Sequence, residues 1–215
     1  MGAIARSAAN NITTSGVFTS SAITNSSVTG ITVLANASDG ITLISSQTAS
    51  NSASISFTSG LTSTYKAYKF VFVNMNPATD NVQFEFNLST DSGSNYNVTK
   101  TTTSVKTRHD ENDANPELSY RTDFDLAQST SYQVLGREIG NASDESCSGT
   151  LTLFNPASTT YVKHFIATTN FQNAADVCEG FYIAGYGNTT SAVNAINFRM
   201  SSGNFDGTIA LYGIK

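Results

Sequence analysis

The sequence is poor in charged residues. Asp, Glu, Lys and Arg make up only 13% of the chain, about half of the usual share of roughly 25%. Sixteen acidic residues against 11 basic ones give a net charge of −5. Because nucleic-acid affinity comes largely from Lys and Arg that neutralise phosphates, we expect no nucleic-acid partner.

Cysteine, histidine and tryptophan are scarce or absent. Cys147 and Cys178 are the only cysteines; they are too few for a disulfide scaffold, and we expect two free, half-buried thiols, although the spacing leaves a pairing open. His109 and His164 are the only histidines, so a nucleophile would have few bases to choose from. No G-x-S-x-G motif is present, and we expect no enzymatic activity.

Long apolar runs are also missing. The opening residues MGAIARSAANN hold only a short apolar patch before Arg6, which is too short for the core of a signal peptide. No stretch approaches the length that crosses a bilayer, so we expect no membrane insertion.

From about residue 41 onward, apolar and polar residues alternate at period two, which is typical of strands with one face in a core. Residues 68–74 (YKFVFVN) are apolar on both faces, as in a central strand. Residues 82–89 (VQFEFNLS) point Val and Phe inward and Gln83, Glu85 and Asn87 outward. Eight to ten such strands predict an all-β antiparallel two-sheet sandwich of jelly-roll type.

Three turn segments are predicted between strands. Residues 91–95 (DSGSN) follow one alternating run and precede another, which predicts a hairpin. The segments around 76–78 and 155–157 both contain Asn-Pro-Ala. Proline pre-sets φ and favours an extended residue before it, so we interpret the two segments as corresponding hairpin loops.

The first forty residues differ from the rest of the chain. Short residues dominate there, and isolated aliphatic residues cannot close a core alone. The alternatives are a disordered tail and an anchoring segment that orders against another subunit. We therefore divide the chain into an assembly segment, 1–40, and a sandwich, 41–215. The assembly contacts are expected at five aliphatic residues: Ile23, Val28, Ile31, Val33 and Leu34.

Residues 107–130 interrupt the alternation with a long polar excursion, TRHDENDANPELSYRTDFDLAQST. Long loops of this kind are commonly functional, so we expect a surface-contact loop here. The candidate contact residues are Arg108, His109, Asp110, Glu111, Asp113, Tyr120 and Arg121.

The sequence also offers candidates for other chemistry. The carboxylates could bind calcium, but their spacing matches no EF-hand loop, and a solvated acidic loop is the default. A carboxylate pair could cleave a glycoside, but no rigid cleft is indicated. Tyr96, Tyr120 and Tyr132 could stack on sugars or be ordinary rim and core tyrosines.

His164 shares a strand face with apolar neighbours, so we expect a packed or interface histidine. No cofactor or metal is expected.

Several stretches of the chain are distinctive: the STDSGSNYN segment, the two Asn-Pro-Ala turns, and AGYGNTTSAVNAINFRMSSGNFDGTIALYGIK with its LYGI ending. Together they resemble a family of virion-associated proteins from marine tailed bacteriophages, and the likeness spans roughly residues 41–215. The resemblance implies a virion component of jelly-roll topology that forms a homotrimer. The opening MGAIARSAANNITTSG resembles the short attachment segment of such proteins.

The expected function is a non-enzymatic tail-fibre or appendage protein, anchored to other virion proteins by its N-terminal segment and displaying the sandwich for contact with host-surface glycan. It would be assembled in the host cytoplasm and located at the virion surface. A neutral, hydroxyl-rich surface suits a protein displayed in many copies, because it limits aggregation. One alternative is a capsid decoration protein, and another is a carbohydrate-binding module outside any particle.

Overall fold

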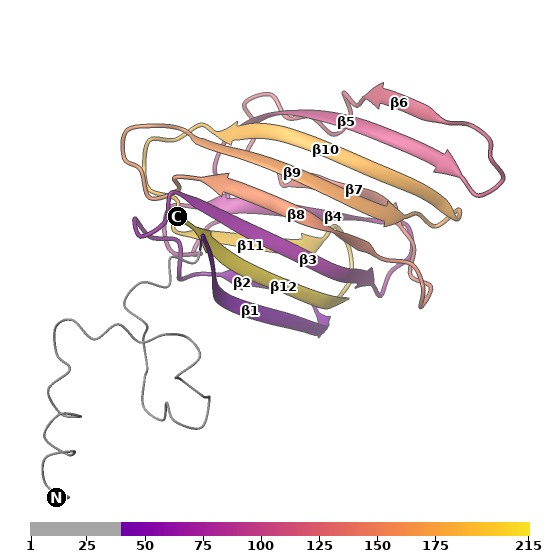
Figure 1. Ribbon diagram of the computed structural model, residues 1–215, viewed down its shortest axis with the longest axis horizontal. Helices are drawn as coiled ribbons and strands as arrows, with labels where there is room; N and C mark the ends of the chain where they lie inside the picture. The colour runs from indigo at the N-terminus through magenta and orange to yellow at the C-terminus, as the bar shows by residue number, and fades with distance from the viewer. Residues whose placement is uncertain (1–39) are drawn as a thin grey trace, which may run out of the picture. The chain divides into compact units, whose positions relative to one another are not determined.

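The computed structural model describes residues 40–215 and shows two antiparallel sheets packed face to face, with no helix in that part of the chain (Figure 1). Sheet A has the strand order β1-β12-β3-β8-β9-β10-β5-β6, and sheet B has the order β2-β11-β4-β7. The strands are β1 (Ile41–Ser52), β2 (Ser54–Phe57), β3 (Ala67–Pro77), β4 (Val82–Ser89), β5 (Lys100–Asp110), β6 (Glu117–Tyr120), β7 (Gln133–Ile139), β8 (Cys147–Phe154), β9 (Lys163–Gln172), β10 (Val177–Gly187), β11 (Ala195–Met200) and β12 (Phe205–Ile214).

The predicted all-β antiparallel sandwich is confirmed, with twelve strands in residues 40–215 in place of eight to ten. The chain crosses repeatedly between the two sheets, from β3 to β4 to β5 and from β10 to β11 to β12, which agrees with the predicted jelly-roll type. Within these residues, no helix is long and apolar enough to cross a membrane.

The core is built from aromatic side chains of both sheets. Phe198 of β11 lies at the centre, with ring centroids 5.3 Å from Phe70 and 5.2 Å from Phe72 of sheet A. Phe84 and Phe86 of β4 lie 6.1 and 6.2 Å from the same ring. Offset and edge-to-face pairs of this kind add to the free energy of area burial. The prediction of a central strand at 68–74 is confirmed, because β3 lies between β12 and β8.

The prediction that the polar face of β4 is exposed is wrong. Glu85 and Asn87 are buried, although the prediction placed them outward in solvent. The Asn87 amide donates hydrogen bonds to the carbonyl oxygens of Tyr96 (2.7 Å) and Thr130 (2.9 Å). Segments distant in sequence therefore cover this face, which a period-two pattern cannot reveal.

Two turn predictions are also corrected. The turn at 91–94 forms, with Ser94 N–H donating to Asp91 O at 3.3 Å, but it leads from β4 in sheet B to β5 in sheet A and so closes no hairpin. Likewise, the first Asn-Pro-Ala segment crosses between sheets, whereas the second joins the neighbours β8 and β9. The expectation of an extended residue before proline is wrong at Asn155, which has φ +45°. The two segments are therefore not corresponding turns.

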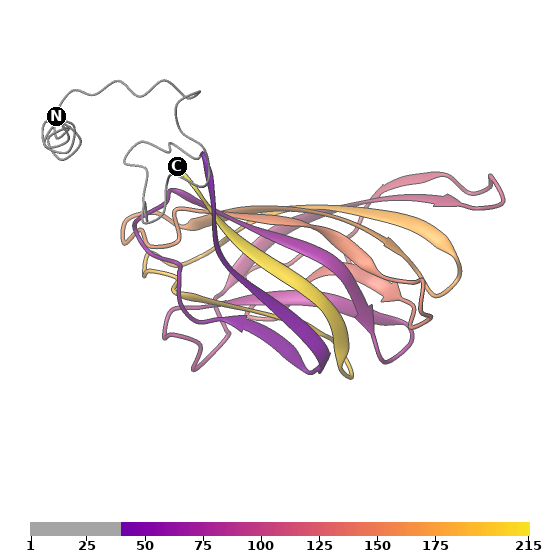
Figure 2. The same cartoon turned by 60° about the horizontal axis from the view of Figure 1, so that its bottom comes forward.

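Residues 107–130 are not a single loop. Residues 107–110 complete β5, and β6 pairs with it, Arg108 opposite Glu117 and Val105 opposite Tyr120. The hairpin reaches beyond the ends of the neighbouring strands (Figure 2). The polar residues between the two strands gave the sequence its loop-like character.

Both cysteines are free, as predicted. They are not half-buried, however. Cys147 is completely buried and Cys178 is exposed.

Candidate interaction surfaces

The outer face of sheet A carries almost no charge. Three adjacent rows of paired residues cross it, and Lys69 is the only Lys, Arg, Asp or Glu among them. We call these rows the three-row face. Its members are Ile41, Ile214, Ala67, Phe154, His164, Tyr186 and Thr101; Leu43, Tyr212, Lys69, Thr152, Ile166, Ala184 and Thr103; and Ala210, Val71, Thr150, Thr168, Tyr182, Val105 and Tyr120.

Large apolar side chains of this face are open to solvent. Six of them are at least 39% exposed: Ile41, Leu43, Tyr120, Phe154, Ile166 and Tyr182. Threonines stand between them on β5, β8 and β9. Scattered exposed apolar residues are ordinary, but a contiguous apolar surface is typical of an interaction site.

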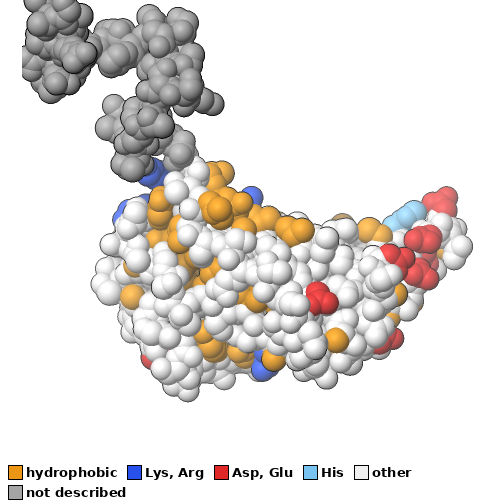
Figure 3. Space-filling model, turned by 90° about the horizontal axis from the view of Figure 1, so that it is seen from below, with side chains coloured by type: hydrophobic (Ala, Val, Ile, Leu, Met, Phe, Trp, Pro, Cys, Tyr) orange, Lys and Arg blue, Asp and Glu red, His pale blue; other side chains and the backbone are white. Residues whose placement is uncertain are grey.

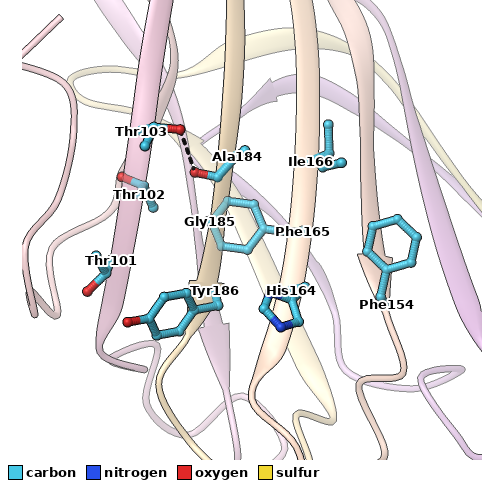
Figure 4. A pocket seen from close by; sticks show the side chains of 10 residues that line it. All are labelled: Thr101, Thr102, Thr103, Phe154, His164, Phe165, Ile166, Ala184, Gly185 and Tyr186. Atoms are coloured by element: carbon cyan, nitrogen blue, oxygen red, sulfur yellow. Dashed lines mark hydrogen bonds between the residues drawn. The ribbon is translucent and has the colours of Figure 1, made fainter.

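A groove of about 510 Å³ is set into this face across β5, β10, β9 and β8 (Figure 4). Ala184 gives its floor only a methyl side chain. His164 and Tyr186 form one end, with their ring centroids 6.0 Å apart and the rings edge to face. His164 is exposed on this face, so a packed histidine is wrong, and an interface histidine stays a prediction. Among the described residues it forms no ion pair with an acidic side chain.

The predicted contact residues divide into two groups. Arg108, His109, Asp110, Glu111 and Asp113 lie together around the turn between β5 and β6. Acidic and histidine side chains are visible at this end of the molecule, whereas most of the surface in the same view is uncharged (Figure 3).

Several charges in the hairpin turn are paired locally. Arg108 Nη2 lies 3.1 Å from Asp110 Oδ1, and His109 Nε2 lies 3.2 Å from Asp113 Oδ1. The Asn115 amide donates to Asp110 Oδ2 at 2.8 Å and, with Arg108, lowers the pKa of Asp110. These contacts brace the turn. In residues 40–215, no group of three or more His, Cys, Asp or Glu side chains is arranged to hold a metal ion.

Tyr120 and Arg121 lie at the far end of β6, away from the hairpin turn. Tyr120 belongs to the three-row face, where Val105 separates it from Tyr182. Its hydroxyl donates to Asp125 Oδ2 at 2.6 Å, which raises the pKa of Tyr120. Arg121 pairs with Asp123. The structure therefore does not bring the seven predicted residues into one site.

A second candidate is a polar pocket of about 420 Å³ on the outer face of sheet B. Its floor is the cross-strand pair of Glu85 on β4 and Arg199 on β11, with Gln83 beside it. Arg199 Nε donates to Glu85 Oε1 at 2.8 Å. Burial raises the pKa of Glu85, and the contact with Arg199 opposes that rise.

The wall of this pocket comes from the connection between β6 and β7. Tyr132 lies there with its ring centroid 3.8 Å from the Arg199 guanidinium carbon, and its hydroxyl donates to Asn197 Oδ1 at 3.1 Å. Phe124 adds an apolar surface. Of the three tyrosines considered for glycan stacking, Tyr132 lines this pocket, whereas Tyr120 lies on sheet A and Tyr96 outside both surfaces.

Sequence reasoning missed both the three-row face and the pocket. The face had a visible signal, because threonines and apolar residues share the outward positions of several strands. For the pocket only Tyr132 was a candidate, because Tyr132, Arg199 and the pair Gln83 and Glu85 come from three distant segments. The predicted assembly residues Ile23, Val28, Ile31, Val33 and Leu34 lie outside the described residues. The boundary at residue 40 stays a prediction.

Comparisons of the chain with protein-family models, with curated proteins and with solved structures found no match.

Proposed function

We propose that this chain is a non-enzymatic structural protein of a bacteriophage particle, most specifically a tail-fibre or appendage protein. Its N-terminal segment joins other virion proteins, and its sandwich stands at the virion surface. The resemblance of residues 41–215 to virion-associated proteins supports the particle assignment.

The observation that carries an assembly role is the three-row face. A sheet face with one charged residue and six well-exposed large apolar side chains is unfavourable in water. Interface cores are likewise depleted of charge and enriched in aromatic residues. We assign this face to contact with a second copy of the chain, which accords with the homotrimer that the resemblance implies.

The first experiment measures the molar mass of the purified full chain by light scattering after size exclusion. Wild type should be oligomeric, and Ile166→Lys should shift it toward monomer, because a buried unpaired charge in an apolar contact costs several kcal/mol. Ser54→Lys is the matched control: it adds the same charge to the exposed outer row of sheet B and should leave the mass unchanged. A monomeric wild type, or equal effects of the two variants, would contradict the assembly role.

The second experiment tests the particle itself. Mass spectrometry of purified virions should detect the chain, and a variant lacking residues 1–40 should fold but fail to join particles. Copy number then separates the fibre from the capsid decoration protein, since a decoration protein covers the capsid in many more copies than a fibre. Absence of the chain from virions would overturn the proposal.

A further inference from the structure

The pocket on sheet B has hydrogen-bonding groups that the protein leaves open. Within residues 40–215, Arg199 Nη1 and Nη2, Glu85 Oε2 and the Gln83 side-chain amide have no hydrogen-bond partner. The Glu85 side chain is only 9% exposed. Glu85 Oε2 is not a buried atom without a partner, since only Ser104 Oγ and Ser119 Oγ have that status among the described residues. It is open to the pocket, where a donating ligand can replace solvent.

Contacts with neighbouring side chains position Arg199 and Tyr132 in the pocket. The guanidinium of Arg199 is fixed on one edge by Glu85 and on one face by Tyr132, at 3.8 Å. Tyr132 is fixed in turn by Asn197. Both floor residues lie on strands, Glu85 pairing with Arg199 on one side and Val134 on the other. A preorganised site loses little conformational entropy when a ligand binds.

The charges of the pocket balance. Glu85 is paired with Arg199, and Asp123 is paired with Arg121, whose guanidinium carbon lies 5.0 Å from the centroid of the Phe124 ring. A phosphate or other anion would need surplus positive charge, and an ammonium group would need surplus negative charge. The remaining match is a neutral ligand with many hydroxyls, which donates to the carboxylate and accepts from the guanidinium and amide.

The size and lining of the pocket agree with this chemistry. Its volume of about 420 Å³ lies within the usual range of small-ligand sites, about 300–1,000 Å³. Phe124, Leu126 and Val134 supply carbon surface beside the polar floor. Pyranose rings have the same division, with C–H groups on one side and hydroxyls at the rim.

We propose that this pocket binds a neutral hexopyranose unit of a glycan. The inference deepens the proposed function by naming what the displayed sandwich holds, and it rests on that function only for its biological setting. Loss of sugar binding would leave particle incorporation and oligomeric state unaffected, so the two proposals fail separately.

The test is ligand-observed NMR and calorimetry on the full chain with the methyl glycosides of glucose, galactose and mannose. One or more should bind with a Kd of the order of 1 mM, and a neutral glycan on a multivalent support should bind more tightly. Gln83→Ala, which removes a half-buried amide from the pocket, should weaken binding about tenfold. Gln172→Ala removes an amide from β9 in sheet A and should leave the affinity unchanged.

Further outcomes decide the proposal. Glu85→Gln should also weaken binding. A melting curve shows whether this variant is folded, and if it is not, Gln83→Ala alone decides the test. No binding of any neutral glycoside at about 10 mM would overturn the proposal. So would equal affinity in wild type and a folded Gln83→Ala variant, or binding of glucuronic and sialic acids alone.

Discussion

Lys100 offers a direct test of how burial shapes the stability of this fold. It begins β5, and its side chain is completely buried between the sheets. Nζ donates to Asn87 Oδ1 and to Val98 O, the latter at 2.9 Å. No carboxylate among the described residues forms an ion pair with it. Burial accordingly lowers the pKa of Lys100 to about 7.

The sign of the resulting pH dependence follows from the two pKa values. In the unfolded chain the pKa is about 10.4, so between pH 7 and that value the unfolded chain binds more protons than the folded one. The free energy of unfolding therefore rises with pH across this window, by at most about 1.4 kcal/mol per pH unit. Across the whole window, the free energy of unfolding would rise by about 5 kcal/mol in total. The two acceptor oxygens favour the ammonium, so we expect about 2–4 kcal/mol.

The assay is urea unfolding of wild type and Lys100→Met at several pH values between about 6 and 10. Titrations common to both proteins largely cancel in the difference of their unfolding free energies, which should shift in favour of wild type as pH rises. Lys66→Met, at an exposed position, is the matched control and should give a flat difference. A flat difference for Lys100→Met as well would refute the reasoning.

Two other buried groups, the Glu179 carboxylate and the Cys147 thiol, give predictions for stability and for chemical reactivity. Glu179 is completely buried and accepts two hydrogen bonds from Arg137, at 2.9 and 3.0 Å. Glu179→Gln should lower the free energy of unfolding, measured in urea, by about 3–5 kcal/mol. Glu138 is the exposed partner of the same arginine, and Glu138→Gln should change the free energy of unfolding by under about 1 kcal/mol. Equal losses in the two variants would contradict the argument from burial. For the thiols, Cys178 should react with a thiol reagent in the native protein and Cys147, whose pKa burial raises, only after unfolding. Equal native rates would contradict this.

The strands could be predicted because their signal is local. In β3 and β4, alternate aromatic and aliphatic residues point to the core as the period-two pattern requires. The sequence pattern did not indicate which strands pair with one another or which segments cover them. The turn after Ser89 has the right residues for a turn, but turn chemistry does not decide which sheet receives the next strand. The same limit explains the covered face of β4, where Asn87 meets Thr130.

The candidate surfaces were less predictable for a related reason. The sequence predicts a single polar loop over residues 107–130, and within it the contact residues between 108 and 113 do lie together because they are contiguous. Tyr120 was assigned to that group by sequence distance, but strand pairing places it on the three-row face near Tyr182. The pocket pair of Glu85 and Arg199 is separated by 114 residues. No local pattern can predict a pair of that kind.

The two surfaces lie on opposite outer faces of the sandwich, the three-row face on sheet A and the pocket on sheet B. Contact between copies through sheet A would therefore leave the pocket open. Each copy in an oligomer would then present one weak site, and linked weak sites gain effective affinity without any new contact when geometry lets them engage together. If the three-row face forms the proposed contact between copies, a weak affinity for a monosaccharide would be compatible with firm attachment, because several pockets would engage together.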